Sequence, residues 1–243
     1  MGVSEFRDKI IGEYKHKIEM HAHTKPMSSC SSVDSAELVK LYHQKGYDGV
    51  VIANHFSNYS LNKMQGFDKE AYIDAFLENV AEAEKAAEKY GMTVYLGCEL
   101  RFDENDNDYL IYGVDRDILY KCYYYMDKDI SAFRREVSLP QSVFIQAHPF
   151  RGTVNLVDPS LLDGMEMLNM HPWFNQIPSK TIQYTYENNL KIKTAGSDFH
   201  APDHVAGSAL RAKFIPKDSF ELAELLRSGD YVLEIGENVI VLP

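Results

Sequence analysis

Five short apolar runs in this sequence each end on residues that can bind a metal ion. In residues 17–24, apolar Ile18 and Met20 alternate with polar residues, which is the period-two pattern of a β-strand. Side chains two positions apart on a strand point to the same face, so His21 and His23 can converge on one ion. The other runs cover residues 50–55, 94–99, 143–148 and 192–200, and they end on His55, Glu99, His148 and the pair Asp198 and His200.

Segments with helical periodicity separate most of these strands. Asp34 stands three residues before Glu37, as in a capping box, and Gly46 is placed to end the helix that follows. The predicted strands cover residues 17–24, 49–55, 93–101, 108–114, 142–148, 164–170 and 191–197, with short extended segments at 211–215, 231–235 and 239–242. The predicted helices cover residues 34–45, 68–90, 115–136, 179–189 and 219–227, and residues 56–66 are expected to form a loop.

This alternation is typical of an α/β fold in which crossover helices join parallel strands. In barrels of this kind, functional residues collect at the carboxyl ends of the strands, and every candidate ligand in this sequence stands at such an end. The pattern alone leaves open whether the sheet closes into a barrel.

The composition fits one enzyme-like domain. With 243 residues, of which 45% are hydrophobic, the chain can bury a sizeable core, and we expect a single domain over residues 1–243. No apolar run approaches the roughly 18 residues needed to cross a bilayer, and the charged N-terminus does not resemble a signal peptide. We therefore expect a cytoplasmic protein that does not contact membranes.

Charge and cysteine usage argue against several kinds of partner and site. The formal net charge of −11 disfavours binding to a nucleic-acid polymer, because such binding depends on neutralising phosphates with Lys and Arg. The three cysteines, Cys30, Cys98 and Cys122, lack C-x-x-C spacing, which argues against a disulfide framework and against a thiolate zinc site. Cys30 and its neighbour Ser29 are interpreted as loop residues rather than as a covalent nucleophile.

Taken together, the ligand-bearing segments resemble the PHP (polymerase and histidinol phosphatase) domain superfamily of metal-dependent phosphoesterases. The motifs lie in the family's order within residues 17–205, and they are His21-Ala-His-Thr24, the segment 46–55, Gly97-Cys-Glu99, His148-Pro149 and Gly196-Ser-Asp-Phe-His200. The resemblance implies a distorted (β/α)7 TIM-like barrel, completed by the C-terminal helix and short strands of residues 206–243. It also implies two or three divalent transition metal ions at the rim, with Zn, Mn, Fe and Co all compatible with mixed imidazole and carboxylate ligands.

On the family pattern, the candidate ligands divide among three ions. The first would be held by His21, His23, Glu99 and Asp198, the second by Glu99 as a bridge together with His148, and the third by His55 and His200. Three departures leave the number of ions open: the loop after His23 offers only serines such as Ser28 and Ser29, the strand at 108–114 has Tyr109 or Leu110 where a histidine is often found, and Asn54 replaces an aspartate. The second and third sites are therefore expected to be weaker.

These residue types suit hydrolysis of a phosphoester. Two ions about 3.5 to 4 Å apart lower the pKa of bound water from about 15.7 to about 7 and clamp the phosphoryl oxygens. Glu99 and Asp198 are the candidate catalytic residues, because Glu99 would set the spacing of the ions and Asp198 would bind metal or deprotonate the attacking water. The candidates for substrate binding are Arg151, Arg101 and His171, and Glu19 and His204 are expected to support ligand histidines through hydrogen bonds.

We therefore expect a histidinol-phosphatase-like, metal-dependent hydrolase of phosphomonoesters or short phosphodiesters that uses a metal-bound hydroxide. Its substrate would be a phosphorylated small molecule, such as a histidinol-phosphate-like metabolite or a nucleotide, with a phosphotyrosine peptide also open. Two alternatives remain: an amide or lactone hydrolase on the same metal barrel, and a degenerate barrel that binds metal or ligand without catalysis. The sequence does not give the oligomeric state. The hydrolase hypothesis requires the residues His21, His23, Glu99, His148 and Asp198 to converge on one pocket.

Overall fold

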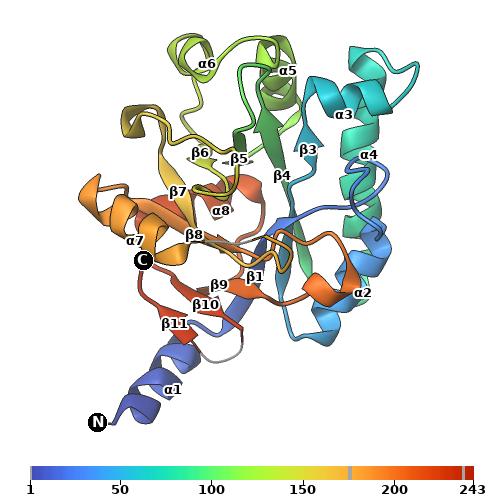
Figure 1. The fold of residues 1–243 in the computed structure, drawn as a ribbon. Coiled ribbons are helices and arrows are strands. Elements are labelled where there is room, and N and C mark those ends of the chain that lie inside the picture. Colours follow the sequence, from blue (N-terminus) through green and yellow to red (C-terminus); the bar gives the residue numbers. More distant parts are fainter. Residues whose placement is uncertain (1, 175–176, 237–238) are drawn as a thin grey trace.

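The computed structural model describes residues 2–174, 177–236 and 239–243, and within them helices surround one curled sheet (Figure 1). The strands are β1 (His16–Ala22), β2 (Gly49–Ile52), β3 (His55–Phe56), β4 (Thr93–Arg101), β5 (Asp108–Tyr112), β6 (Val143–Gln146), β7 (Gly164–Asn169), β8 (Ile192–Gly196), β9 (Ser208–Ala212), β10 (Val232–Ile235) and β11 (Val239–Val241). The helices are α1 (Val3–Glu13), α2 (Ser35–Gln44), α3 (Asn58–Lys63), α4 (Lys69–Glu88), α5 (Arg116–Tyr125), α6 (Ile130–Glu136), α7 (Pro178–Glu187) and α8 (Ser219–Ser228).

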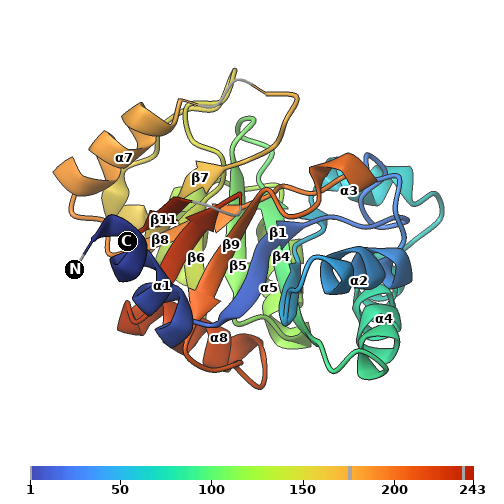
Figure 2. The same ribbon diagram turned by 90° about the horizontal axis from the view of Figure 1, so that it is seen from below.

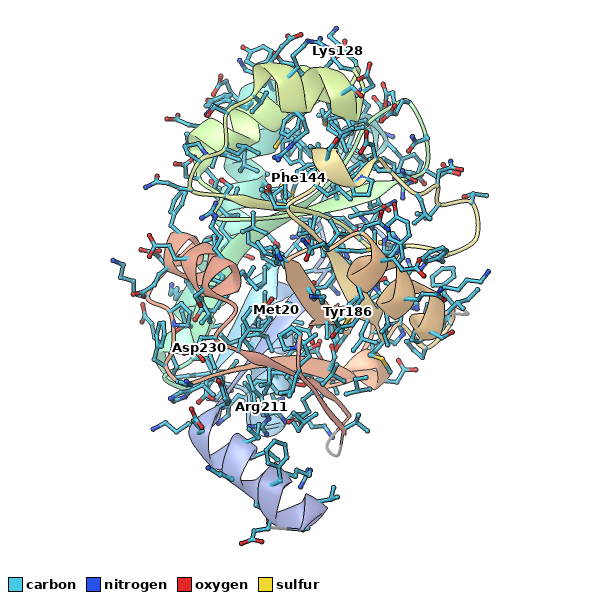
Figure 3. All side chains as sticks on the ribbon, turned by 90° about the vertical axis from the view of Figure 1, so that its left-hand side faces the viewer. Met20, Lys128, Phe144, Tyr186, Arg211 and Asp230 are labelled. Atoms are coloured by element: carbon cyan, nitrogen blue, oxygen red, sulfur yellow. The ribbon has the colours of Figure 1, made fainter. Side chains whose placement is uncertain are left out.

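The sheet has the strand order β11-β10-β9-β1-β2-β4-β5-β6-β7-β8, and β3 pairs with β4. Helices α2 and α4 pack together on one flank of the curled sheet, and α7 packs on the opposite flank (Figures 1 and 2). Helix α8 contributes Leu222 and Leu226 to the same buried cluster as Ile18 and Met20 of β1. Figure 3 shows Met20 inside the curl and Phe144 beneath the α5–α6 segment. The sheet forms a distorted barrel, as the sequence predicted.

The strands are parallel in only part of the sheet, although the sequence pattern favoured parallel strands joined by crossover helices. Strands β1, β2 and β4 are parallel, and so are β6, β7 and β8, but β5 runs antiparallel to both β4 and β6. The reason is the connection between β4 and β5, which spans only residues 102–107 and is too short for a crossover helix. Strands β9, β10 and β11 are likewise antiparallel.

The segment after β8, which is the last strand in the sheet order, returns to the sheet at strand β1. The first half of β1 pairs with β9, in the register His16 with Ala212 and Ile18 with Leu210. Its last residues turn to the segment after β8: the Phe199 amide donates to the His21 carbonyl at 3.1 Å, and the His23 amide donates to the Phe199 carbonyl at 2.9 Å. The barrel is therefore closed by backbone hydrogen bonds at the end that carries the candidate ligands.

Several local predictions need correction. The expected loop at 56–66 contains β3 and α3, and Ser57 caps α3 by accepting the Ser60 amide. The predicted helix at 115–136 is two helices, each begun by an aspartate cap. Helix α1 was not predicted, although Val3, Phe6 and Ile10 stand at helical spacing, and none of its side chains is buried. The extended segment expected at 211–215 is β9, which begins at Ser208.

Among the described residues, no helix is long and apolar enough to span a bilayer.

Strands β7 and β8 are closely packed at Gly164, and a substitution there can test this packing. A Cβ atom at this position would lie 2.1 Å from the carbonyl oxygen of Ile192, its partner in β8. We expect Gly164→Ala to lower the free energy of unfolding by about 1–3 kcal/mol, the usual cost of overpacking, in urea titrations followed by circular dichroism. Gly12→Ala in α1 is the control, because a Cβ there meets nothing within 4 Å. Equal unfolding free energies for the two variants would contradict the packing argument.

Candidate metal centre

Four of the predicted ligands converge inside the rim of the barrel. The Nε2 atom of His21 lies 3.0 Å from Nε2 of His23 and 3.2 Å from Oε1 of Glu99. Oδ1 of Asp198 lies 3.7 Å from the same His21 nitrogen and 3.4 Å from the His23 nitrogen. All four side chains are buried. Atoms at these separations could be bridged by one cation, so the four residues form one candidate site.

Glu99 also faces a second group of ligand atoms. Its Oε1 lies 3.0 Å from Nε2 of His148, and that nitrogen lies 3.5 Å from Oδ2 of Asp108. Asp108, which the sequence-based ligand set did not include, thus lies in this second group, whereas Tyr109 and Leu110 offer no histidine there. Because β5 is antiparallel, its first residue lies at the rim where β4 ends, so Asp108 is paired with Arg101 at the end of β4. A search limited to the ends of apolar runs misses such a residue.

The remaining predicted ligands lie beside His23. The ring centroid of His23 is 4.3 Å from that of His55 and 4.4 Å from that of His200. One nitrogen from each of these three histidines lies within 4.8 Å of the others, and Nδ1 of His55 is 2.6 Å from Oε2 of Glu99. The structure thus brings all of the predicted ligands into one cluster.

Hydrogen bonds on the outer side of the rings indicate which nitrogen of each histidine can bind metal. Nδ1 of His21 lies 2.8 Å from Oε1 of Glu166 and donates to it, because an ionised carboxylate only accepts. Nδ1 of His23 donates to Oγ of Ser28 at 3.1 Å, since the Ser28 hydroxyl gives its own proton to Asn54 at 2.9 Å. With both Nδ1 atoms engaged, as inferred from their partners, the two Nε2 atoms face each other across 3.0 Å and are the nitrogens left to bind metal. Without metal, the raised pKa of His21 places a proton on its Nε2, which donates to Nε2 of His23.

His200 is held in the same way. Its Nδ1 donates to the backbone carbonyl of Asp198 at 2.8 Å, which leaves Nε2 with a lone pair. Metal-binding histidines almost always donate their other ring N–H to a carboxylate, carbonyl or water in this manner. His204, expected to support a ligand histidine, accepts the backbone amide of His200 through Nδ1 at 3.2 Å. It therefore fixes the backbone of His200 rather than its ring.

The cluster buries carboxylates that need positive charge nearby. Burial alone would raise the pKa of Asp198, but His21, His23 and Arg151 hold that pKa well below its usual range. Burial likewise disfavours a charge on His21, yet the carboxylates around it, with Glu166 first, raise its pKa well above the usual value. A proton on His21 therefore takes over the role that a metal cation would have among these anions. The donor set fits a divalent transition metal.

Two buried glutamates contact different parts of His21, one its backbone and the other its imidazole ring. Glu19 accepts the His21 backbone amide at 2.8 Å, the Ser197 amide at 2.9 Å, the Ser197 hydroxyl at 2.6 Å and the Tyr42 hydroxyl at 2.9 Å. Burial raises the pKa of Glu19 to about 7. Glu19 thus ties β1 to the end of β8, whereas Glu166, which was not predicted, holds the imidazole. The sequence signal for Glu166 is a single acidic residue inside the apolar run 164–170.

Two residues of the cluster have positive φ angles, which residues other than glycine rarely adopt. Asp198 has φ of 50° and His148 has φ of 27°. Such positions are costly and collect at functional sites, where the surrounding structure holds them in place. Each follows a strand of the barrel, β8 or β6, and turns its side chain towards the shared cluster.

The predicted substrate-binding residues line two clefts that meet over the cluster. One cleft of about 360 Å³ contains Glu99 and Tyr59, and another of about 270 Å³ contains Arg151, His171, Trp173 and Asp198. Both clefts are lined by Cys30, His55, Arg101 and Asp108.

The two arginines differ in their contacts. Arg101 makes a bidentate ion pair with Asp108 at 2.6 and 2.5 Å. Arg151 contacts Asp198 and lies 3.2 Å from Oδ1 of Asn169, with its guanidinium 4.3 Å from the ring centroid of Phe174. Nε of Arg151 is buried and has no hydrogen-bond partner among the described residues. Among the described residues, Arg151 therefore makes no bidentate ion pair of the kind that engages Arg101.

Comparison with known proteins supports the fold. No protein-family model matches the sequence, and no curated protein matches it at a significant level. The structure is similar to a two-domain protein from Bacteroides vulgatus that contains a predicted PHP-like metal-dependent phosphoesterase, with a TM-score of 0.63 and 18% identity. That match covers 91% of this chain and 65% of the other, so this chain spans less than two thirds of its length.

A second similar structure is PsfC from Pseudomonas syringae, with a TM-score of 0.56, 14% identity and coverage of 80% of each chain. Identities this low show a shared fold. The predicted resemblance to PHP-like proteins is thus confirmed at the level of the barrel.

Glu166 offers a test of the metal centre that does not require turnover. Replacing it by Gln removes the charged acceptor of the His21 ring, and changes of this kind typically cost about 10–100-fold in metal affinity. We expect that loss for Glu166→Gln in competition titrations of Zn or Mn against a chromogenic chelator. Glu82→Gln, on the exposed face of α4, is the matched control and should bind as the wild type does. Unchanged affinity in Glu166→Gln would argue against His21 as a ligand.

Proposed function

We propose that this chain is a metal-dependent hydrolase of small phosphomonoesters or short phosphodiesters that uses two or three divalent transition metal ions. The observation that carries the proposal is the pair of Nε2 atoms of His21 and His23, 3.0 Å apart and flanked by Glu99 and Asp198. Structural supports fix both rings with those atoms facing inward. Such a buried donor set is costly to maintain unless a cation uses it.

Bound divalent ions would supply the chemistry that phosphoester hydrolysis needs, namely an acidified water and positive charge at the phosphoryl oxygens. Glu99 is placed to span two ions, because Oε1 faces His21 and His148 while Oε2 faces His55. Both oxygens of Asp198 are engaged, Oδ1 by the histidines and Oδ2 by Arg151 and Asn169. Asp198 is therefore better suited to binding metal than to removing a proton from water.

Arg151 would meet the substrate phosphate. Its side chain lines the cleft that Asp198 and His200 also line. A guanidinium forms strong charge-assisted hydrogen bonds to phosphate oxygens, and Arg151 is held in place by Asp198 on one side and Phe174 on the other. The net charge of −11 makes a local cation at the rim important for attracting an anionic ester.

The organic part of the substrate would lie against aromatic side chains. Trp173 and Phe174 are 65% and 49% exposed beside one cleft, and Tyr59 is 65% exposed beside the other. Exposed aromatic rings next to a polar pocket favour a substrate with a flat or apolar leaving group. A histidinol-phosphatase-like specificity is compatible with this arrangement, and so is a nucleotide.

The function is tested by metal-dependent turnover. Purified protein should contain at least two equivalents of transition metal, and a chromogenic phosphomonoester should be hydrolysed, cease to be hydrolysed after chelation, and be hydrolysed again with Mn or Zn. We expect His21→Ala and Asp198→Ala each to reduce turnover to the uncatalysed rate, because each removes a ligand, while circular dichroism shows an intact fold. His43→Ala, on the exposed side of α2, is the matched control and should retain activity.

Other outcomes would identify the alternatives. Hydrolysis of amides or lactones alone would replace the phosphoesterase assignment with the second hydrolase class. Full metal content without turnover on any ester, amide or lactone would indicate a binding protein. Unchanged kinetics in His21→Ala would contradict the metal centre itself.

A further inference from the structure

Cys30 lies against two of the candidate ligands. Its side chain is solvent-accessible, and its thiol is within hydrogen-bond reach of both His55 and His200. It also lines both clefts that meet over the metal cluster. The other two cysteines are buried in the core beside each other and do not line these clefts.

The loop that carries Cys30 is fixed to the segment that carries His200. The Ser32 amide donates to the His200 carbonyl at 2.9 Å, and the Ser31 hydroxyl contacts the carbonyls of His23 and His200 at 3.0 and 3.2 Å. On the other side of Cys30, Oγ of Ser28 accepts the His55 amide at 3.0 Å. Hydrogen bonds on both sides therefore place the thiol between the two histidines.

The surrounding atoms are in the states that metal ligands adopt. His200 donates through Nδ1 to the Asp198 carbonyl, so its Nε2 carries a lone pair. Oε2 of Glu99 is buried and lies 2.6 Å from Nδ1 of His55, so the two side chains form an ion pair. One nitrogen from each of His23, His55 and His200 lies within 4.8 Å of the others. Three imidazoles gathered beside a buried carboxylate are independent evidence that a cation belongs there.

We propose that Cys30 is a thiolate ligand of the third metal ion, which it binds together with His55 and His200 and with Glu99 close by. Binding would replace the S–H bond by a metal–sulfur bond and release the proton to solvent. The missing loop ligand, sought among the serines of residues 28–32, is thus supplied by the cysteine between them. This replaces the expectation, drawn from the absence of C-x-x-C spacing, that no thiolate binds metal in this chain.

A thiolate ligand changes which ion the site selects. Soft sulfur combined with imidazole favours Zn, Co or Fe over Mn and Mg. The inference rests on the metal centre of the proposed function but not on turnover.

Cobalt substitution tests the proposal by spectroscopy. The full-length chain, stripped by a chelator and loaded with Co(II), should show a thiolate-to-cobalt charge-transfer band in the near ultraviolet. Cys30→Ala should lose that band and one equivalent of cobalt, with the circular dichroism spectrum unchanged. Cys30→Asp should regain the equivalent through a carboxylate but not the band. Ser29→Ala, at the neighbouring exposed position, is the matched control and should keep both.

Two results would overturn the proposal. A fully loaded wild-type protein without a thiolate band, or a Cys30→Ala variant that keeps the band and all of its cobalt, rules out Cys30 as a ligand. Turnover of a phosphoester without a thiolate band would leave the proposed function standing and remove only this inference. A thiolate band in a protein that hydrolyses no ester would do the reverse.

Discussion

Two backbone hydrogen bonds between Phe199 and the end of β1 hold the candidate centre together. They join the strand that carries His21 and His23 to the turn that carries Asp198 and His200, two segments far apart in the sequence. The side chain of Phe199 is buried on the other side of this joint. Without this pairing the curled sheet would be open between β1 and β8, because β9 pairs only with the first half of β1. The hydrogen bonds that close the barrel therefore also bring the candidate ligands together.

Burying several carboxylates near the pairing of β1 with Phe199 is electrostatically unfavourable, and neighbouring donors and positive charges at the rim offset this cost. Glu19, Glu99, Glu166 and Asp198 are all buried within a short distance of one another, and buried anions are unfavourable unless paired. Glu19 is satisfied by four neutral donors, which connect β1, β8 and α2. Glu99, Glu166 and Asp198 are instead paired with histidines or with Arg151. Their burial therefore depends on positive charge from protonated histidine, the Arg151 guanidinium or a metal ion. Stability and metal binding are coupled at this point.

Much of the fold and centre could be predicted from the sequence because parallel strands place their carboxyl ends on one rim. That rule correctly grouped His55, Glu99 and His148 with the two histidine motifs before any coordinates were considered. It failed for Asp108, whose antiparallel strand enters at that rim, and for Glu166, which lies within its strand. Helix α1 was missed although Val3, Phe6 and Ile10 stand at helical spacing, and it buries no side chain. For Asp108 and Glu166, the missing information was a tertiary relation rather than a local pattern.

The reversed strand β5 has a consequence for how such a pocket can diversify. Asp108 reaches the centre directly after the six-residue connection of residues 102–107, so it is presented by a hairpin rather than by a strand locked between crossover helices. Surface hairpins tolerate insertions and deletions far better than buried strands. Changes in the length of this connection can therefore shift or remove one carboxylate while the barrel stays intact. Changes in this hairpin can thus alter which ions the centre binds during evolution, while the barrel fold is retained.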